Sequence, residues 1–252
     1  MTRAHLPMAV AFSWVVATPL LAVEQEAHER WVQANQAHDS GNYAAALDAY
    51  RALLADGYAS SPLYYNVGNA ELRSHHLGAA IAAYRHSLSL DPRNADARAN
   101  LESARKRTHD ALVPPGPSAT ARSLLFWHYA LSGRELLAAS LGTYVTFWLA
   151  LLWRRLRAGS ELAGWIAVTS LVALLLLGGS LLVRHVAPEG LVVVVSPSAS
   201  AHTGTRADSS VRFVLHEGAE VRLLEHEGDW ARVALPDGQQ GWIAMGELVA
   251  AK

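Results

Sequence analysis

The sequence predicts a multidomain protein that joins an all-α region of helical repeats, a two-helix transmembrane hairpin and a small all-β barrel. Three observations predict this organisation. Residues of like character recur 34 positions apart before residue 110, two apolar runs without charge occupy 136–153 and 164–183, and short β-branched segments separated by turns follow residue 190. With 252 residues, the chain is long enough for several small domains.

Charge and cysteine content exclude several classes of function. The chain has 21 basic and 22 acidic residues, so it lacks the basic surface typical of nucleic-acid-binding proteins, and we expect no nucleic-acid partner. It has no cysteine. This excludes a disulfide framework, thiol catalysis and every cysteine-based metal site.

Residues 1–22 predict a signal peptide or an uncleaved signal anchor. Arg3 precedes an apolar run over 8–16, and the small residues Ala17 and Ala22 follow in the order of a secretory signal. Cleavage after either alanine fits the pattern, and so does retention as an anchor. Each alternative exports the segment that follows.

Residues 27–110 predict helices that repeat with a fixed period along the chain. Ala46 recurs as Ala80, and Tyr50 recurs as Tyr84 at the same spacing. This period and these residue types resemble the tetratricopeptide repeat, a pair of packed helices. The resemblance assigns helix-packing positions to Ala46, Tyr50, Gly68, Ala80, Tyr84 and Pro92.

These packing positions have separate physical reasons. Gly68 and Ala80 are small, which lets paired helices approach closely, while Tyr84 fills the space against the next unit. Asp91 and Pro92 should end a helix, because proline lacks an amide hydrogen and clashes with the preceding turn.

The repeats are degenerate. The first has Ala34 in place of the glycine, and the second has His75 at the turn where the first has Gly41. Glu71 stands where an aromatic residue is usual. Residues 95–110 predict one further charged helix that caps the stack, since a terminal unit must cover the last apolar face.

The resemblance to tetratricopeptide repeats implies a concave groove that binds an extended peptide or a partner helix. Its inner positions transfer to seven residues of this chain: Trp31, Asn35, His38, Tyr65, Asn69, Arg73 and Lys106. The asparagines are suited to bond a partner's backbone, and Arg73 is suited to bind a carboxylate. The alternative is that these are ordinary exposed polar residues on a spacer domain.

Residues 111–123 predict a linker, because three prolines and a glycine within 113–120 favour an extended spacer. We expect the linker to detach the repeat domain from the membrane. Residues 123–134 carry Phe126, Trp127 and Tyr129, aromatic residues typical of a membrane interface.

Residues 136–153 and 164–183 predict transmembrane helices, since each run approaches the roughly 20 apolar residues that a bilayer requires. The loop at 154–163 contains Arg154, Arg155 and Arg157, which the positive-inside rule places in the cytoplasm. We therefore expect a multi-pass protein of the inner (cytoplasmic) membrane, with both flanking domains on the periplasmic or extracytoplasmic side. The alternative is a buried helical pair in a soluble protein.

Residues 189–252 predict five short strands and a small barrel. The tight turn at 236–238 predicts a hairpin. Three features of this region together resemble the bacterial SH3-like domain. They are a glycine before a strand, an acidic residue before a tryptophan, and a turn glycine before a Gly-Trp pair. The residues concerned are Gly218, Asp229, Trp230, Gly238, Gly241 and Trp242.

The SH3-like resemblance implies recognition of cell wall or of a peptide. Residues 196–210 would form a long first loop carrying Arg206, and Arg206 and Trp230 are the candidates for a ligand cleft. At least one tryptophan should be core in so small a barrel, and we expect it to be Trp242.

Catalytic and metal-binding motifs are absent from the sequence. His75 and His76 are adjacent rather than one helical turn apart, and neither His216 nor His226 begins a HExxH motif. No nucleophile elbow, phosphate loop or dinucleotide fingerprint is present. We expect a protein that is not an enzyme, without cofactor or metal.

The order of the parts, namely an exported start, helical repeats, a two-span hairpin and a terminal SH3-like domain, resembles the Bat aerotolerance family. The resemblance implies a membrane-anchored scaffold that works beside von Willebrand factor A domain membrane proteins and a MoxR-type AAA+ ATPase, in tolerance of oxidative stress or in envelope integrity. The alternative function is a peptidoglycan-binding envelope anchor.

Overall fold

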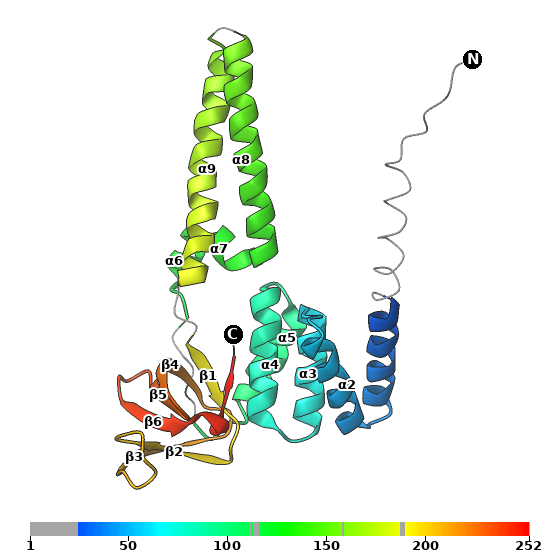
Figure 1. The fold of residues 1–252 in the computed structure, drawn as a ribbon, viewed down its shortest axis with the longest axis vertical. Coiled ribbons are helices and arrows are strands. Elements are labelled where there is room, and N and C mark those ends of the chain that lie inside the picture. Colours follow the sequence, from blue (N-terminus) through cyan, green and yellow to red (C-terminus); the bar gives the residue numbers. More distant parts are fainter. Residues whose placement is uncertain (1–24, 111, 113–115, 158, 187–189, 252) are drawn as a thin grey trace, which may run out of the picture.

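A computed structural model describes residues 25–110, 112, 116–157, 159–186 and 190–251 (Figure 1). The predicted signal segment at 1–22 lies outside these described residues. The rest forms a helical region, a long two-helix hairpin and a β-sheet, in the order that the sequence predicts.

The helical region consists of antiparallel neighbours that begin with helical residues 25–39. The following helices are α2 (Tyr43–Ala55), α3 (Ser61–Arg73), α4 (Leu77–Leu90) and α5 (Ala95–Arg105). Three of them begin at side-chain caps, because Asn42, Ser60 and Asn94 each accept a hydrogen bond from an amide of the first turn. The predicted stop at Asp91 and Pro92 is confirmed, since α4 ends at Leu90.

The predicted packing positions lie in the core of this region. Ala46, Tyr50, Ala80 and Tyr84 are all fully buried. A Cβ atom on Gly68 would lie 2.6 Å from the ring of Tyr84, so only glycine permits this approach of α3 to α4. The need for a small residue at this position is confirmed.

Two short helices precede the hairpin, α6 (Ala119–Leu124) and α7 (Phe126–Ala130). Helix α6 begins inside the segment that the sequence predicts as linker. Trp127 donates its indole N–H to Ser180 Oγ at 3.1 Å, and Arg184 donates to the Leu131 carbonyl at 2.9 Å. These bonds hold α7 against the base of the hairpin.

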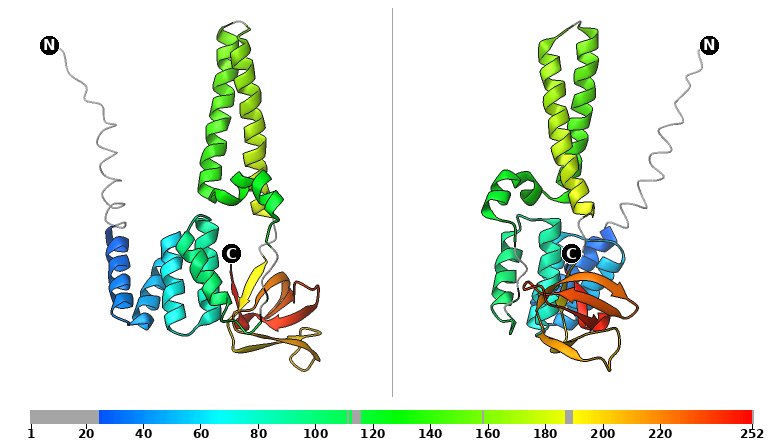
Figure 2. Two further views of the ribbon diagram at one scale, coloured as in Figure 1. Left: turned by 180° about the vertical axis from the view of Figure 1, so that it is seen from behind. Right: turned by 90° about the vertical axis from the view of Figure 1, so that its left-hand side faces the viewer.

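Helices α8 (Gly133–Leu156) and α9 (Glu161–Val186) pack along their whole length and stand away from the remaining fold (Figures 1 and 2). Both are long and apolar enough to cross a membrane, and each extends three residues beyond the predicted run at both ends. Their contact is built mainly from small residues, as in membrane helix pairs. The buried side chains are Leu136, Ser140, Ala150, Ala163, Ala167, Ser170 and Ser180.

The C-terminal part is an antiparallel sheet of seven strands, not the predicted five, and it does not close into a barrel. The strands are β1 (Leu191–Val194), β2 (Ser198–His202), β3 (Val211–His216), β4 (Glu220–Glu227), β5 (Trp230–Ala234), β6 (Gln240–Ala244) and β7 (Leu248–Ala250). Their order is β3-β2-β6-β5-β4-β1-β7. The predicted long first loop is partly wrong, because part of it forms β2.

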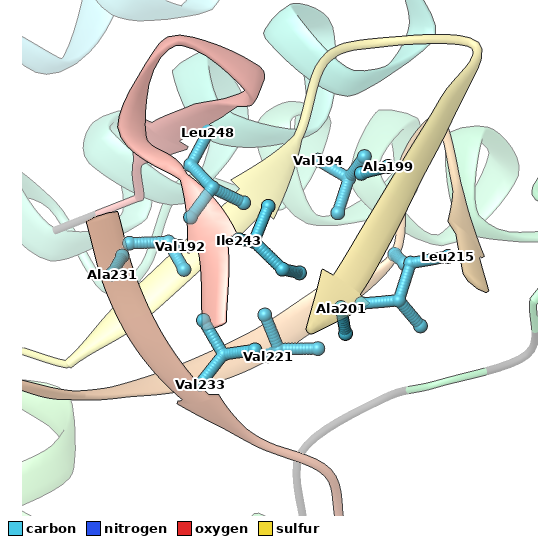
Figure 3. Close-up of a cluster of buried hydrophobic side chains, with 11 residues drawn as sticks. Val192, Val194, Ala199, Ala201, Leu215, Val221, Ala231, Val233, Ile243 and Leu248 are labelled. Atoms are coloured by element: carbon cyan, nitrogen blue, oxygen red, sulfur yellow. The ribbon is translucent and has the colours of Figure 1, made fainter. Parts of the chain in front are cut away.

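The sheet curls around a core of small and branched aliphatic residues that includes Val194, Val221 and Ile243 (Figure 3). Trp242 is only half-buried, so the prediction that it fills the core is wrong. The physical reason is strand alternation. Gly241 and Ile243 of β6 are buried, so Trp242 between them points to the other face of the sheet.

The helical region and the sheet form one packed unit. Helix α4 packs on β1 and β7, and Val193 belongs to the same buried cluster as Ile81 and Tyr84 (Figure 1). Fully buried Glu220 accepts hydrogen bonds from Arg85 Nε at 2.7 Å and Arg105 Nε at 2.6 Å. The helical region is therefore docked on the sheet.

Candidate functional site

The candidate site is a polar groove of about 670 Å³ between α3, α5 and the turn before α2. Four of the predicted groove residues line it: His38, Tyr65, Asn69 and Arg73. The other lining residues are Tyr43, Leu72, His75, Asn100, Ser103 and Arg107.

Asn69 is fixed inside the repeat by two hydrogen bonds. Its Oδ1 accepts the hydroxyl of Tyr84 at 2.8 Å and the amide of Asn100 at 2.9 Å. These bonds connect α3, α4 and α5. The asparagine oxygen therefore holds three helices together at the floor of the groove.

Asn35 makes the same pair of bonds one repeat earlier. Its Oδ1 accepts the hydroxyl of Tyr50 at 2.7 Å and the amide of Asn66 at 2.9 Å. Each member of this set precedes its counterpart in the Asn69 set by one full period of the repeat. The periodicity of the sequence thus recurs as a periodic hydrogen-bond network.

The two tyrosine hydroxyls are protonated donors in this network. Burial raises the pKa of Tyr50 to about 12, against the opposing effect of its amide partner. Burial also raises the pKa of Tyr84 well above its ordinary value. Both hydroxyls therefore remain neutral at physiological pH and donate to the asparagine oxygens.

The charge of the groove is positive. Arg73 and Arg107 line it together with His38 and His75, and none of the described lining residues is acidic. His75 has a positive φ of 66°, a left-handed conformation that favours glycine, which Gly41 supplies at the equivalent turn. Such a groove is suited to bind carboxylates, because guanidinium groups form paired bonds with them.

Three predicted groove residues lie elsewhere. Trp31 lines a separate apolar hollow of about 430 Å³ beside Leu53 and Tyr58. Asn35 is committed to its own network, and Lys106 is exposed at the end of α5 without lining the groove.

Arg107 occupies the place predicted for Lys106. The sequence contains the signal for this, since Arg107 follows Arg73 by one full period of the repeat, and Asn100 follows Asn66 by the same interval. Extending the period into the capping helix would have identified both residues.

Buried Glu71 explains one departure from the repeat pattern. Its carboxylate accepts from Arg51 Nη2 at 2.7 Å and contacts His76 Nδ1 at 2.8 Å. The residue that replaces the usual aromatic therefore ties α3 to α2 by charge.

The two predicted cleft residues of the sheet have separate partners. Arg206 is exposed and pairs with Asp208 at 2.9 Å, while half-buried Trp230 packs edge-on against His202 with ring centroids 5.5 Å apart. A hollow of about 280 Å³ on the sheet is lined by neither of them, but by residues such as Arg222 and Gln240.

Comparison with known proteins adds no relative: the sequence matches no protein-family model and no curated protein.

Proposed function

We propose that the protein is a membrane-anchored, non-enzymatic scaffold whose groove binds an extended acidic segment of a partner protein. The observation that carries this proposal is the pair of arginines in a groove without acidic lining among the described residues. Arg73 and Arg107 would each hold a carboxylate, while Tyr43 and Tyr65 would pack against the apolar parts of the segment.

The helical region would act as a tetratricopeptide-repeat domain and the sheet as an SH3-like domain. The periodic Asn-Tyr-Asn network and the packing of Gly68 against Tyr84 support the first assignment. The glycines and tryptophans of the sheet, although it is open, support the second.

The hairpin would cross the inner membrane. Large apolar side chains such as Leu141, Trp148 and Leu175 are exposed along it, which is costly in water and favourable in lipid. The arginines at its tip would face the cytoplasm, and the docked helical region and sheet would lie together outside.

The order of parts would place the protein in the BatE branch of the Bat aerotolerance family. Its partners would then be the von Willebrand factor A domain Bat membrane proteins that work with a MoxR-type AAA+ ATPase. A rigid unit at the membrane surface suits a scaffold, because it fixes the groove at one height above the lipid.

The groove is tested by peptide binding to the full chain in detergent. We expect fluorescein-labelled peptides rich in Asp and Glu to bind, and matched peptides with Asn and Gln to bind at least about tenfold more weakly. The double variant Arg73→Ala, Arg107→Ala should lose binding by about the same factor. Fluorescence anisotropy measures both effects.

The matched control is Arg206→Ala, Arg212→Ala, which removes the same charge from the exposed edge of the sheet. Unchanged peptide binding in the groove variant, or its loss in the control, would contradict the groove assignment. The same two variants then test the partner, through co-purification of a co-expressed von Willebrand factor A domain protein.

A further inference from the structure

Two histidines and one aspartate meet where the end of the helical region touches the sheet. His109 and Asp110 follow α5, and His216 ends β3. Their potential ligand atoms all lie within 4.8 Å of one another, and the two imidazole centroids are 4.2 Å apart. It is the one group of this kind in the part of the chain that the structure describes.

The carboxylate of Asp110 is oriented by the backbone. Its Oδ2 accepts the N–H of His216 at 2.6 Å, and Thr108 donates its hydroxyl to the Asp110 carbonyl at 3.1 Å. Oδ1 lies at 3.2 Å from Nδ1 of His109 and at 3.2 Å from Nδ1 of His216, and this second nitrogen is also 3.2 Å from Oδ2. One oxygen is thus equidistant from two imidazole nitrogens.

These separations are longer than a charge-assisted hydrogen bond and lie close to the spacing of two ligands on one metal ion. A bond between a charged histidine and a carboxylate is usually about 2.7–2.9 Å long, and His76 lies at 2.8 Å from Glu71 in this chain. Ligands about 2.0–2.1 Å from a tetrahedral zinc ion stand about 3.4 Å apart. The values of 3.2 Å therefore resemble a ligand set around a cation.

The types of ligand atom in this cluster match one class of metal ion. Neutral imidazoles and one carboxylate form a donor set preferred by zinc and similar transition-metal ions, rather than by magnesium.

We propose that His109, Asp110 and His216 bind a divalent transition-metal ion of the zinc class, which clips the helical region to the sheet. The His216 backbone N–H orients the carboxylate, as an outer hydrogen bond does in known zinc sites. The side chain of His109 is 76% exposed, so the fourth position faces solvent and takes water. The ion joins segments more than a hundred residues apart in sequence.

The test uses the full chain in detergent, purified without a histidine tag and stripped with a chelator. We expect competition with a chromophoric chelator to show one tightly bound zinc per chain, and zinc to raise the unfolding temperature whereas magnesium does not. His109→Ala and Asp110→Asn should each weaken zinc binding at least about tenfold and abolish the thermal shift.

His226→Ala is the matched control, because His226 is an exposed histidine of the same sheet outside the cluster. His109 is exposed beyond α5, so its replacement leaves the fold intact and the result interpretable. The proposal is overturned if the parent chain binds no zinc, if the His109 variant binds it as tightly as the parent, or if the His226 variant loses it equally.

Discussion

Asn69 lines the groove, but its hydrogen bonds stabilise the packing of the helices. Its Oδ1 is the acceptor for a hydroxyl that is otherwise buried in an apolar cluster, and Tyr84 itself is fully buried. A buried donor without an acceptor costs about 1–3 kcal/mol, which is more than the net value of a satisfied bond. Asn69 is therefore unsuitable as a binding-site mutation.

We predict that Asn69→Ala lowers stability more than Tyr84→Phe. The first variant leaves the Tyr84 hydroxyl unpaired and should cost about 2–3 kcal/mol, whereas the second removes the donor itself and should cost about 1 kcal/mol. The thermal unfolding midpoint of the full chain measures both. Equal losses would show that the hydroxyl finds another acceptor, such as solvent.

The sequence predicts which residues must be small or large for helix packing. It does not predict which polar side chains bond to a residue on another helix. Gly68 and Tyr84 were predictable, because a small residue one helix away from a large one is a packing pattern. The repeat pattern predicts that Asn69 faces the groove but does not predict its partners on α4 and α5, because an inward amide looks the same whether it bonds a neighbouring helix or a ligand.

At the scale of elements, the junction between the helices and the sheet depends on one buried carboxylate. Glu220 begins β4 and is enclosed by Arg85 of α4 and Arg105 of α5. Burial lowers the pKa of Arg85, and the charge of Glu220 opposes that effect. The partly buried arginines are therefore stable only while the carboxylate of Glu220 balances their charge.

We predict that Glu220→Ala destabilises the docked unit by about 3 kcal/mol, because it leaves two arginines partly buried without a counter-charge. The control Glu225→Ala removes an exposed pair with Arg232 and should cost about 0–1 kcal/mol. Thermal unfolding gives the ranking. Limited proteolysis adds a second measure, since undocking should expose β1 and β7, which pack on α4, in the Glu220 variant only.

The sequence predicts strands where the residues have a high strand propensity. It does not predict a strand where the residues have a low strand propensity. Strand β1, which is Leu-Val-Val-Val, and strand β3, which has two valines, are predicted by the sequence. The sequence predicts a loop where β2 lies, because Ser-Ala-Ser-Ala-His contains no β-branched residue. Its Ala199 and Ala201 are fully buried, and tertiary packing requires alanine there despite its weak preference for strands.

At the scale of the whole molecule, the helical region and the sheet lie at the same end of the hairpin, and the arginine tip lies at the other (Figure 2). The two ordered regions flank the hairpin in sequence and contact each other in space. Any membrane that the hairpin crosses must therefore leave both on one side. The sequence predicts the same side for both regions from the charge of the hairpin loop, whereas the contact between them is visible only in the structure.

The absence of cysteine allows a direct test of this topology. We predict that Ser210→Cys, in the exposed loop between β2 and β3, reacts with a membrane-impermeant maleimide in intact spheroplasts. Ser160→Cys, in the loop between α8 and α9, should react only after the membrane is permeabilised. The cysteine-free parent gives the background.

Each pattern of labelling has one structural meaning. Reaction of Ser210→Cys alone in intact spheroplasts supports two spans with the arginine tip inside, and reaction of Ser160→Cys alone would invert the hairpin. Reaction at both positions would mean that the helices lie along the surface or span separately, which is incompatible with the packing of α8 on α9 over their whole length. In that case the exposed leucines and tryptophans would require a protein partner rather than lipid, and the groove would face a different compartment.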